Sequence, residues 1–256
     1  MAFSNNQNTA IYYEQHGEGK PVVLLHGGAT SFRFNYGVFG WIEALNETGF
    51  RVIGLDMRGH GRSDKPIAPE EYGTNKLASD VLAVMDELGI DDAFVVGYSL
   101  GSAVALHLIQ SRPERFSKAA LVATGDGLLG YPPHTFSALL PVLAEAVSRS
   151  EFPDDLPAHV AAYWTFVTQS GGSREAISSA AKAEYPALSQ DLAAKIQVPV
   201  LVVSGERDPV LGQGPRLAEA LGQGEYLEIE KADHFNLAAK NSVKKAIAAF
   251  LLKGKA

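Results

Sequence analysis

Apolar residues recur along this chain in two alternating patterns, which predict β-strands and α-helices in turn. Short apolar and β-branched runs predict strands at residues 9–15, 21–25, 51–55, 93–96, 118–123, 198–203 and 226–229. Helical spacing lies between them, at residues 38–47, 74–88, 99–111, 213–221 and 238–252, with Thr74 as the predicted cap of its helix. Continuous apolar strands between helices predict a parallel sheet that is covered on both faces.

One segment interrupts this alternation. Between Gly125 and Ile196 no strand pattern is present, and six prolines separate aromatic and alanine-rich helical pieces. A stretch of about 70 residues without a strand, inside a regular α/β alternation, predicts an inserted helical lid. We therefore expect residues 1–124 and 197–256 to form one α/β core, interrupted by a lid at residues 125–196.

A predicted strand-to-helix turn carries the sequence Gly97-Tyr98-Ser99-Leu100-Gly101, which fits G-x-S-x-G. The chain must reverse sharply here, and glycines two positions to either side of Ser99 avoid collisions between the two elements. Such a turn exposes the serine hydroxyl at a helix N-terminus, whose unpaired N–H groups favour a developing anion. The chain has no cysteine, so a thiol cannot take this role. Ser99 is the predicted nucleophile.

A serine nucleophile needs a base that takes its proton and a third group that orients the base. Of the seven histidines, His234 follows the last strand, so its imidazole can reach a serine at the same sheet edge. Asp208, after the preceding strand, is the predicted acid, and Asp126 and Glu206 are weaker alternatives. The chain order Ser99, Asp208, His234 is the order expected when the serine lies in a strand-to-helix turn of this kind.

Acyl transfer also needs two N–H groups that hold the negative oxygen of the transition state. Leu100, directly after the nucleophile, supplies one of them by its position. The second is expected from the turn after the strand at 21–25, with Gly28 as the favoured donor and Ala29 as the alternative. His26 in the same turn is expected to fix this loop by hydrogen bonding.

These motifs resemble the α/β-hydrolase superfamily along nearly the whole chain. VLLHGG at 23–28 resembles its oxyanion loop, and GLDMRGHGRSD at 54–64 resembles its D-x-R-G-x-G-x-S-D loop. VVGYSLG at 95–101 and VPVLVVSGERD at 198–208 resemble its nucleophile elbow and its acid strand. Ala232 departs from the glycine that relatives commonly carry two residues before the histidine. The resemblance implies an α/β-hydrolase fold with a mostly parallel sheet of about eight strands, and a serine hydrolase activity.

Other patterns exclude several classes of ligand. The dinucleotide pattern G-x-G-x-x-G occurs at residues 125–130, but Pro132 and Pro133 prevent the helix that this motif must open. No metal-binding motif is present, so neither a cofactor nor a metal is expected. The net charge of −7 and the scattered basic residues predict no nucleic-acid partner.

No apolar run reaches the roughly 18 residues of a membrane span, and no signal peptide is visible, so we expect a cytoplasmic protein.

The expected substrate is a small to medium apolar carboxylic ester or lactone, cleaved through an acyl-enzyme on Ser99. The predicted substrate contacts are Ala29, Phe32, Tyr98, Leu129, Tyr131, Trp164 and Phe235. His134 and His159 in the lid are further candidates for contact. Two alternatives stay open. One is another reaction on the same triad, namely carbon–carbon bond hydrolysis, amide hydrolysis or cofactor-free perhydrolysis. The other is a slow-turnover ligand-sensing protein of the same fold.

Overall fold

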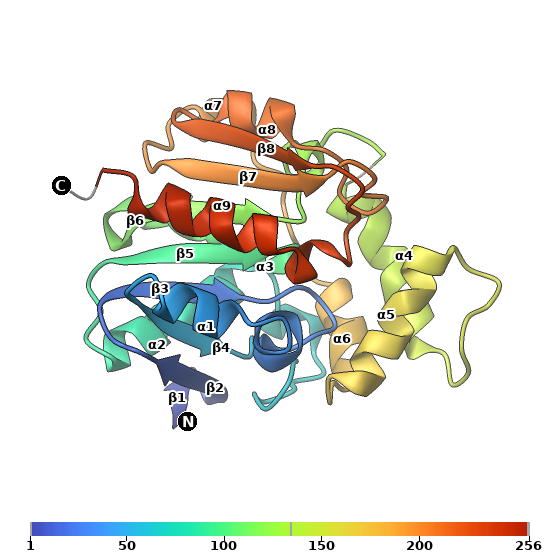
Figure 1. The fold of residues 1–256 in the computed structure, drawn as a ribbon. Helices are drawn as coiled ribbons and strands as arrows, with labels where there is room; N and C mark the ends of the chain where they lie inside the picture. Colours follow the sequence, from blue (N-terminus) through green and yellow to red (C-terminus); the bar gives the residue numbers. More distant parts are fainter. Residues whose placement is uncertain (1, 134, 255–256) are drawn as a thin grey trace.

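The computed structural model describes residues 2–133 and 135–254, which contain an eight-stranded sheet of order β1-β2-β4-β3-β5-β6-β7-β8 (Figure 1). The strands are β1 (Ala2–Asn6), β2 (Thr9–His16), β3 (Lys20–Leu25), β4 (Phe50–Leu55), β5 (Ala93–Tyr98), β6 (Phe116–Val122), β7 (Val200–Gly205) and β8 (Gly224–Ile229). β2 pairs antiparallel with β1 and with β4, and every other neighbouring pair is parallel. The predicted mostly parallel sheet is confirmed.

Alternate residues of the central strands face two apolar cores. Val23 and Val95 face one core, whereas Leu24 and Val96 face the other. The first core packs against α2 (Thr74–Glu87), α3 (Leu100–Ser111) and α8 (Pro215–Ala220). The second packs against α1 (Trp41–Asn46) and α9 (Asn241–Leu252). Because both faces are covered, β5 and β7 are buried at every position, which explains their continuous apolar sequences.

Between β6 and β7 the chain leaves the sheet. The described residues of this stretch form α4 (Phe136–Ser148), α5 (Ala158–Gln169), α6 (Arg174–Ala181) and α7 (Gln190–Ala193). The first three, called the inserted helices below, pack on one another beyond the carboxyl ends of the parallel strands (Figure 1). Thr135 and Ser173 cap α4 and α6, each accepting a hydrogen bond from a backbone N–H three residues later.

The structure corrects three details of the predicted elements. β1 is an additional strand that the mostly polar sequence at residues 2–6 does not predict. It lies at the edge of the sheet, where Phe3 is 56% exposed. The helix predicted at 38–47 begins only at Trp41, because Gly40 with a φ of 71° occupies the N-cap position of α1, and a separate π-helix (Arg33–Gly37) precedes it. Gly73, with a φ of 90°, occupies the N-cap position of α2, and Thr74 is its first helical residue.

A fully buried ion pair ties the loop after β4 to α2. Nε and Nη2 of Arg58 donate to the two carboxylate oxygens of Asp80, each at 2.6 Å, and both side chains are 0% exposed. Removal of Asp80 leaves the buried Arg58 charge with only the longer ion pair to the exposed Glu71 carboxylate, at 3.3 Å. We therefore expect Asp80→Ala to lower the free energy of unfolding by about 3–5 kcal/mol, measured by urea denaturation.

Asp86 offers a matched control on the same helix. Its carboxylate pairs with Arg115 at 2.7 Å, but the Asp86 side chain is 64% exposed. An exposed pair contributes about 1 kcal/mol or less, so Asp86→Ala should have a correspondingly small effect. An equally small effect of Asp80→Ala would contradict the stabilising role of the buried pair.

Candidate active site

Ser99 lies in the tight turn between β5 and α3. Its φ of 52° is in the left-handed region, which a serine adopts only with strain. A Cβ atom at Gly97 would lie 2.2 Å from the carbonyl oxygen of Gly101, and one at Gly101 would lie 2.1 Å from that of Leu25. Neither position can carry a side chain unless the backbone moves. The two glycines of G-x-S-x-G therefore allow the close approach that holds Ser99 at the start of α3.

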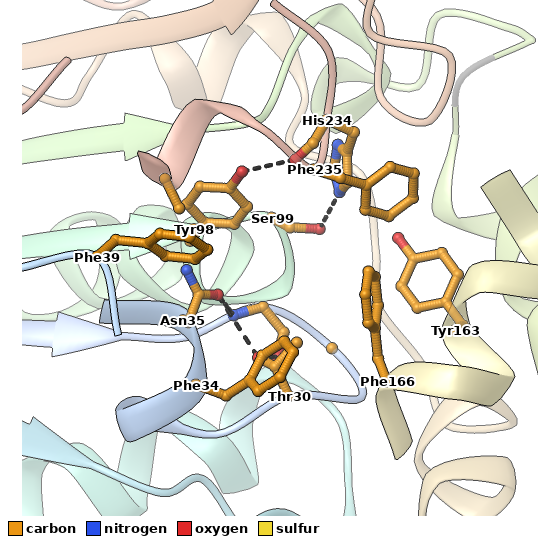
Figure 2. A pocket seen from close by; sticks show the side chains of 13 residues that line it. Thr30, Phe34, Asn35, Phe39, Tyr98, Ser99, Tyr163, Phe166, His234 and Phe235 are labelled. Carbon is orange, nitrogen blue, oxygen red and sulfur yellow. Dashed lines mark hydrogen bonds between the residues drawn. The ribbon is translucent and has the colours of Figure 1, made fainter. Parts of the chain in front are cut away.

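Three side chains from three different loops meet at this turn. Nε2 of His234 lies 2.9 Å from Oγ of Ser99 (Figure 2), and Nδ1 of His234 lies 2.9 Å from Oδ2 of Asp208. All three residues are buried. In this arrangement the imidazole can accept a proton from the hydroxyl while the carboxylate orients the ring.

Further hydrogen bonds hold Asp208 in its charged form. Its Oδ1 accepts from the backbone N–H groups of Val210 and Leu211, at 2.8 and 3.0 Å. Burial by itself would raise the pKa of Asp208, but the attraction of His234 and these hydrogen bonds outweigh burial and hold the pKa below its ordinary value. Asp208 is therefore ionised at neutral pH and can stabilise a protonated imidazole.

The two alternative acids make other contacts. Oδ1 of Asp126 accepts from the backbone N–H of Leu217 in α8, at 2.9 Å. Oε2 of Glu206 accepts from the backbone N–H of Lys231, at 2.8 Å. Of the three acids considered, only Asp208 is hydrogen-bonded to His234 within the described residues.

The two expected oxyanion donors, Gly28 and Leu100, lie close to each other near Ser99. Leu100 is the first residue of α3, so its N–H has no acceptor one helical turn earlier. The N–H of Ala29 donates to Nε2 of His60 at 3.1 Å and is already engaged. Gly28 lies beside Leu100, since a Cβ at Gly28 would be 3.8 Å from the Leu100 Cβ. Its position and the engagement of Ala29 favour Gly28 as the second donor.

Two buried histidines support the loop that contains Gly28. Nδ1 of His60 lies 3.0 Å from the Arg58 carbonyl oxygen. Nδ1 of His26 lies 2.7 Å from the Gly27 carbonyl oxygen, and its Nε2 accepts from the Met57 N–H at 3.0 Å. Each ring therefore carries one proton, on Nδ1. Burial lowers the pKa of His26 to about 4 and that of His60 to about 3.

We expect the free energy of unfolding to fall as the pH drops from about 6.5 towards about 4, the window between the unfolded and folded pKa values of these histidines. There the unfolded chain binds a proton on each histidine and the folded chain does not, so acid favours unfolding. Each histidine adds up to about 1.4 kcal/mol per pH unit. Urea denaturation across this range measures the slope. His60→Gln keeps an acceptor oxygen but cannot titrate. The pH dependence of its unfolding free energy should therefore lack the contribution of one histidine, up to about 1.4 kcal/mol per pH unit. An unchanged slope would contradict the assignment.

Two cavities meet at Ser99. The larger cavity, of about 270 Å³, extends past His234 (Figure 2). Besides Ser99 and His234, its walls are mainly aromatic and include Thr30, Phe34, Asn35, Phe39, Tyr98, Tyr163, Phe166 and Phe235. The smaller cavity, of about 30 Å³, lies between Ser99 and the inserted helices. Gly28, Ser99 and Tyr163 line both cavities.

Three of the predicted substrate contacts lie at these cavities. Tyr98 and Phe235 line the larger cavity, and Ala29 lines the smaller one. The hydroxyl of Tyr98 also donates to the backbone carbonyl of His234 at 2.6 Å, which fixes the loop that carries the base (Figure 2).

The other four predicted contacts line neither cavity. Phe32 is fully buried against β4, where a Cβ at Gly54 would lie 2.1 Å from its ring. Trp164 packs within the inserted segment, because the Arg174 guanidinium lies 4.2 Å from its ring centre. Leu129 packs against the first core. The Tyr131 hydroxyl accepts a hydrogen bond from Gln190 at 2.5 Å. Of the two histidines, His134 lies outside the described residues, and His159 lines neither cavity.

Residues missing from the predicted contacts form much of the larger cavity. Phe34 and Asn35 come from the π-helix after β3, and Tyr163 and Phe166 come from α5. Residues three apart share one face of a helix, whereas Trp164 is turned away from that face. The helical spacing of Tyr163 and Phe166 was therefore a signal that the sequence contained.

Within residues 2–133 and 135–254, no group of three or more histidine, aspartate or glutamate side chains is placed to hold a metal ion. None of the helices in this described part is long and apolar enough to cross a membrane.

The family model of the alpha/beta hydrolase fold matches residues 20–173. This chain belongs to the α/β-hydrolase family. A second model, of TAP-like proteins, matches residues 176–256. The matched regions include the β5–α3 turn of the family fold and the strands that precede Asp208 and His234. The fold class predicted from the sequence is confirmed.

Known α/β hydrolases resemble this chain over nearly its whole length. The AB hydrolase superfamily protein YisY from Bacillus subtilis (strain 168) is 25% identical over 247 residues, covering 89% of this chain and 90% of that protein. The structure of Est816, described as an N-acyl homoserine lactone degrading enzyme, has a TM-score of 0.76 and 29% sequence identity. The match covers 97% of this chain and 99% of that one. The structure of the enol-lactonase from Burkholderia xenovorans LB400 has a TM-score of 0.75 and 27% sequence identity. The match covers 98% of this chain and 100% of that one.

Proposed function

We propose that this α/β hydrolase cleaves carboxylic esters or lactones through an acyl-enzyme on Ser99. The observation that carries the proposal is the unbroken contact from Asp208 through His234 to the Ser99 hydroxyl. The two lactone-cleaving structures that resemble this chain support the substrate class.

In the proposed reaction, Oγ of Ser99 attacks the carbonyl carbon while Nε2 of His234 takes the hydroxyl proton. The N–H groups of Gly28 and Leu100 hold the negative oxygen that forms. His234 then protonates the leaving oxygen, which releases an alcohol or opens a lactone ring and leaves an acyl ester on Ser99. A water molecule, deprotonated by His234, attacks this ester and regenerates the serine. Asp208 is ionised throughout.

The walls of the site favour a neutral and largely apolar substrate. Neither cavity has a lysine or arginine among its described lining residues. We also propose that residues 125–196 act as a lid over the site. Ser170, at the end of α5, donates a hydrogen bond to the Ala29 carbonyl oxygen at 3.1 Å, which joins the inserted helices to the oxyanion loop.

A phosphonate that mimics the tetrahedral intermediate tests the proposed chemistry. A p-nitrophenyl alkylphosphonate should release one equivalent of p-nitrophenol per chain, and peptide mapping should place the phosphonyl group on Ser99. The same protein should turn over p-nitrophenyl acetate and lose this turnover after labelling. Label on another residue, or full turnover by the labelled protein, would overturn the proposal.

A further inference from the structure

We propose that the smaller cavity is the acyl pocket, and that its size restricts the substrate to acyl groups of about acetyl or propionyl length. The alcohol part then occupies the larger cavity. This inference rests on the proposed function, because it assigns the two halves of an ester that Ser99 attacks.

The position of His234 distinguishes the two cavities. Its imidazole must protonate the leaving oxygen, so the alcohol part must lie on the side of Ser99 that the imidazole faces. His234 and Phe235 line the larger cavity and are not part of the lining of the smaller one. The smaller cavity is instead lined by Leu100, one of the expected oxyanion donors, and by Ala29, which follows the other donor, Gly28. The carbonyl carbon carries only one other substituent, the acyl chain, which therefore lies on the side of the smaller cavity.

The volumes of the two cavities set the length of each part. A water-sized group needs about 10–15 Å³ of such volume. The smaller cavity, at about 30 Å³, therefore has room for about two non-hydrogen atoms beyond the carbonyl carbon. The larger cavity, at about 270 Å³, has room for a ring or a long chain.

Bulky side chains of the inserted helices form one wall of the smaller cavity. Leu140 and Leu143 reach it from α4, and Ile177 reaches it from α6. These three side chains are buried, and α4 packs directly on α6. This side of the cavity is therefore a packed wall, and an acyl chain that extends towards it would need these helices to move.

Tyr163 prevents an acyl chain from passing into the larger cavity. This residue of α5 lines both cavities and is 4% exposed. Its ring makes edge contacts with Phe166 and Phe235, with ring centres 6.2 and 5.9 Å apart, and its hydroxyl points towards the region of Ser99 (Figure 2). The ring is thus fixed between the two halves of the site.

The test measures kcat/KM for p-nitrophenyl esters from acetate to octanoate, with the leaving group held constant. One methylene too many in an apolar pocket costs about tenfold or more, so acetate should exceed hexanoate by at least about 100-fold. Leu140→Ala and Ile177→Ala should each reduce this ratio by about tenfold. Val142→Ala is the matched control, because Val142 lies on α4, is 37% exposed and does not line the cavity. Its ratio should equal that of the unchanged protein.

A ratio measured within one preparation does not depend on the fraction of active protein, so partial misfolding of a variant cannot imitate the effect. Equal rates on acetate and hexanoate would overturn the acyl-pocket inference and leave the proposed hydrolase function standing. An unchanged ratio in both Leu140→Ala and Ile177→Ala would also overturn the inference. If none of the esters in the series were hydrolysed, the proposed function itself would be overturned.

Discussion

Ser99→Ala and His234→Ala are each expected to lower kcat for p-nitrophenyl acetate by about 10⁶-fold. Alanine at residue 99 removes the attacking oxygen, and alanine at residue 234 removes the group that takes its proton at 2.9 Å. Both side chains act in the same step, so the double variant should lose little more activity than either single variant. Steady-state kinetics on all three variants measures this.

Ser111 offers a matched serine at the other end of α3, where its hydroxyl donates to the His107 carbonyl oxygen at 2.7 Å. Ser111→Ala should keep the activity of the unchanged protein. If Ser99→Ala retained more than about a hundredth of the original kcat, or if the two losses multiplied in the double variant, a shared step on Ser99 and His234 would be excluded.

Asp208→Asn should lower kcat by about 10⁴-fold while the protein stays folded. The asparagine oxygen can still accept from the N–H groups of Val210 and Leu211, which places its amino group against Nδ1 of His234. Nδ1 must then be unprotonated, so the ring proton moves to Nε2. An imidazole with a proton on Nε2 cannot accept the proton of Ser99.

Asp126→Asn is the matched control for this prediction, since it removes the same charge at the end of the neighbouring strand. Its oxygen can still accept from the Leu217 N–H, so both activity and stability should change little. Kinetics together with urea denaturation of both variants separates catalysis from folding. A greater loss of kcat in Asp126→Asn than in Asp208→Asn would exchange the two assignments.

Much of the fold could be predicted because its strands are buried on both faces. β5 and β7 are apolar along their length, and such runs separated by helical spacing indicate a parallel sheet. β1 could not be predicted in this way. It is a mostly polar edge strand that forms by pairing with β2. The pattern of its own residues gives no sign of that pairing.

The three candidate catalytic residues could be predicted because each follows a strand of this sheet. Parallel strands end at the same edge, so chain order and strand ends already bring Ser99, Asp208 and His234 towards one place. The choice between Gly28 and Ala29 was different. It depends on His60, which comes from another loop and engages the Ala29 N–H.

The sequence by itself determined the alternation of strands and helices, the glycines that allow the Ser99 turn, and the order of the three candidate catalytic residues. These depend on local sterics and on a simple periodicity. Helical spacing groups Tyr163 with Phe166 and apart from Trp164, but only the tertiary structure decided which of these two faces of α5 points to Ser99. Tyr163 reaches the site and Trp164 does not, although they are neighbours in one helix. The orientation of α5 against the sheet makes that choice, because it follows from packing between segments that are far apart in the chain.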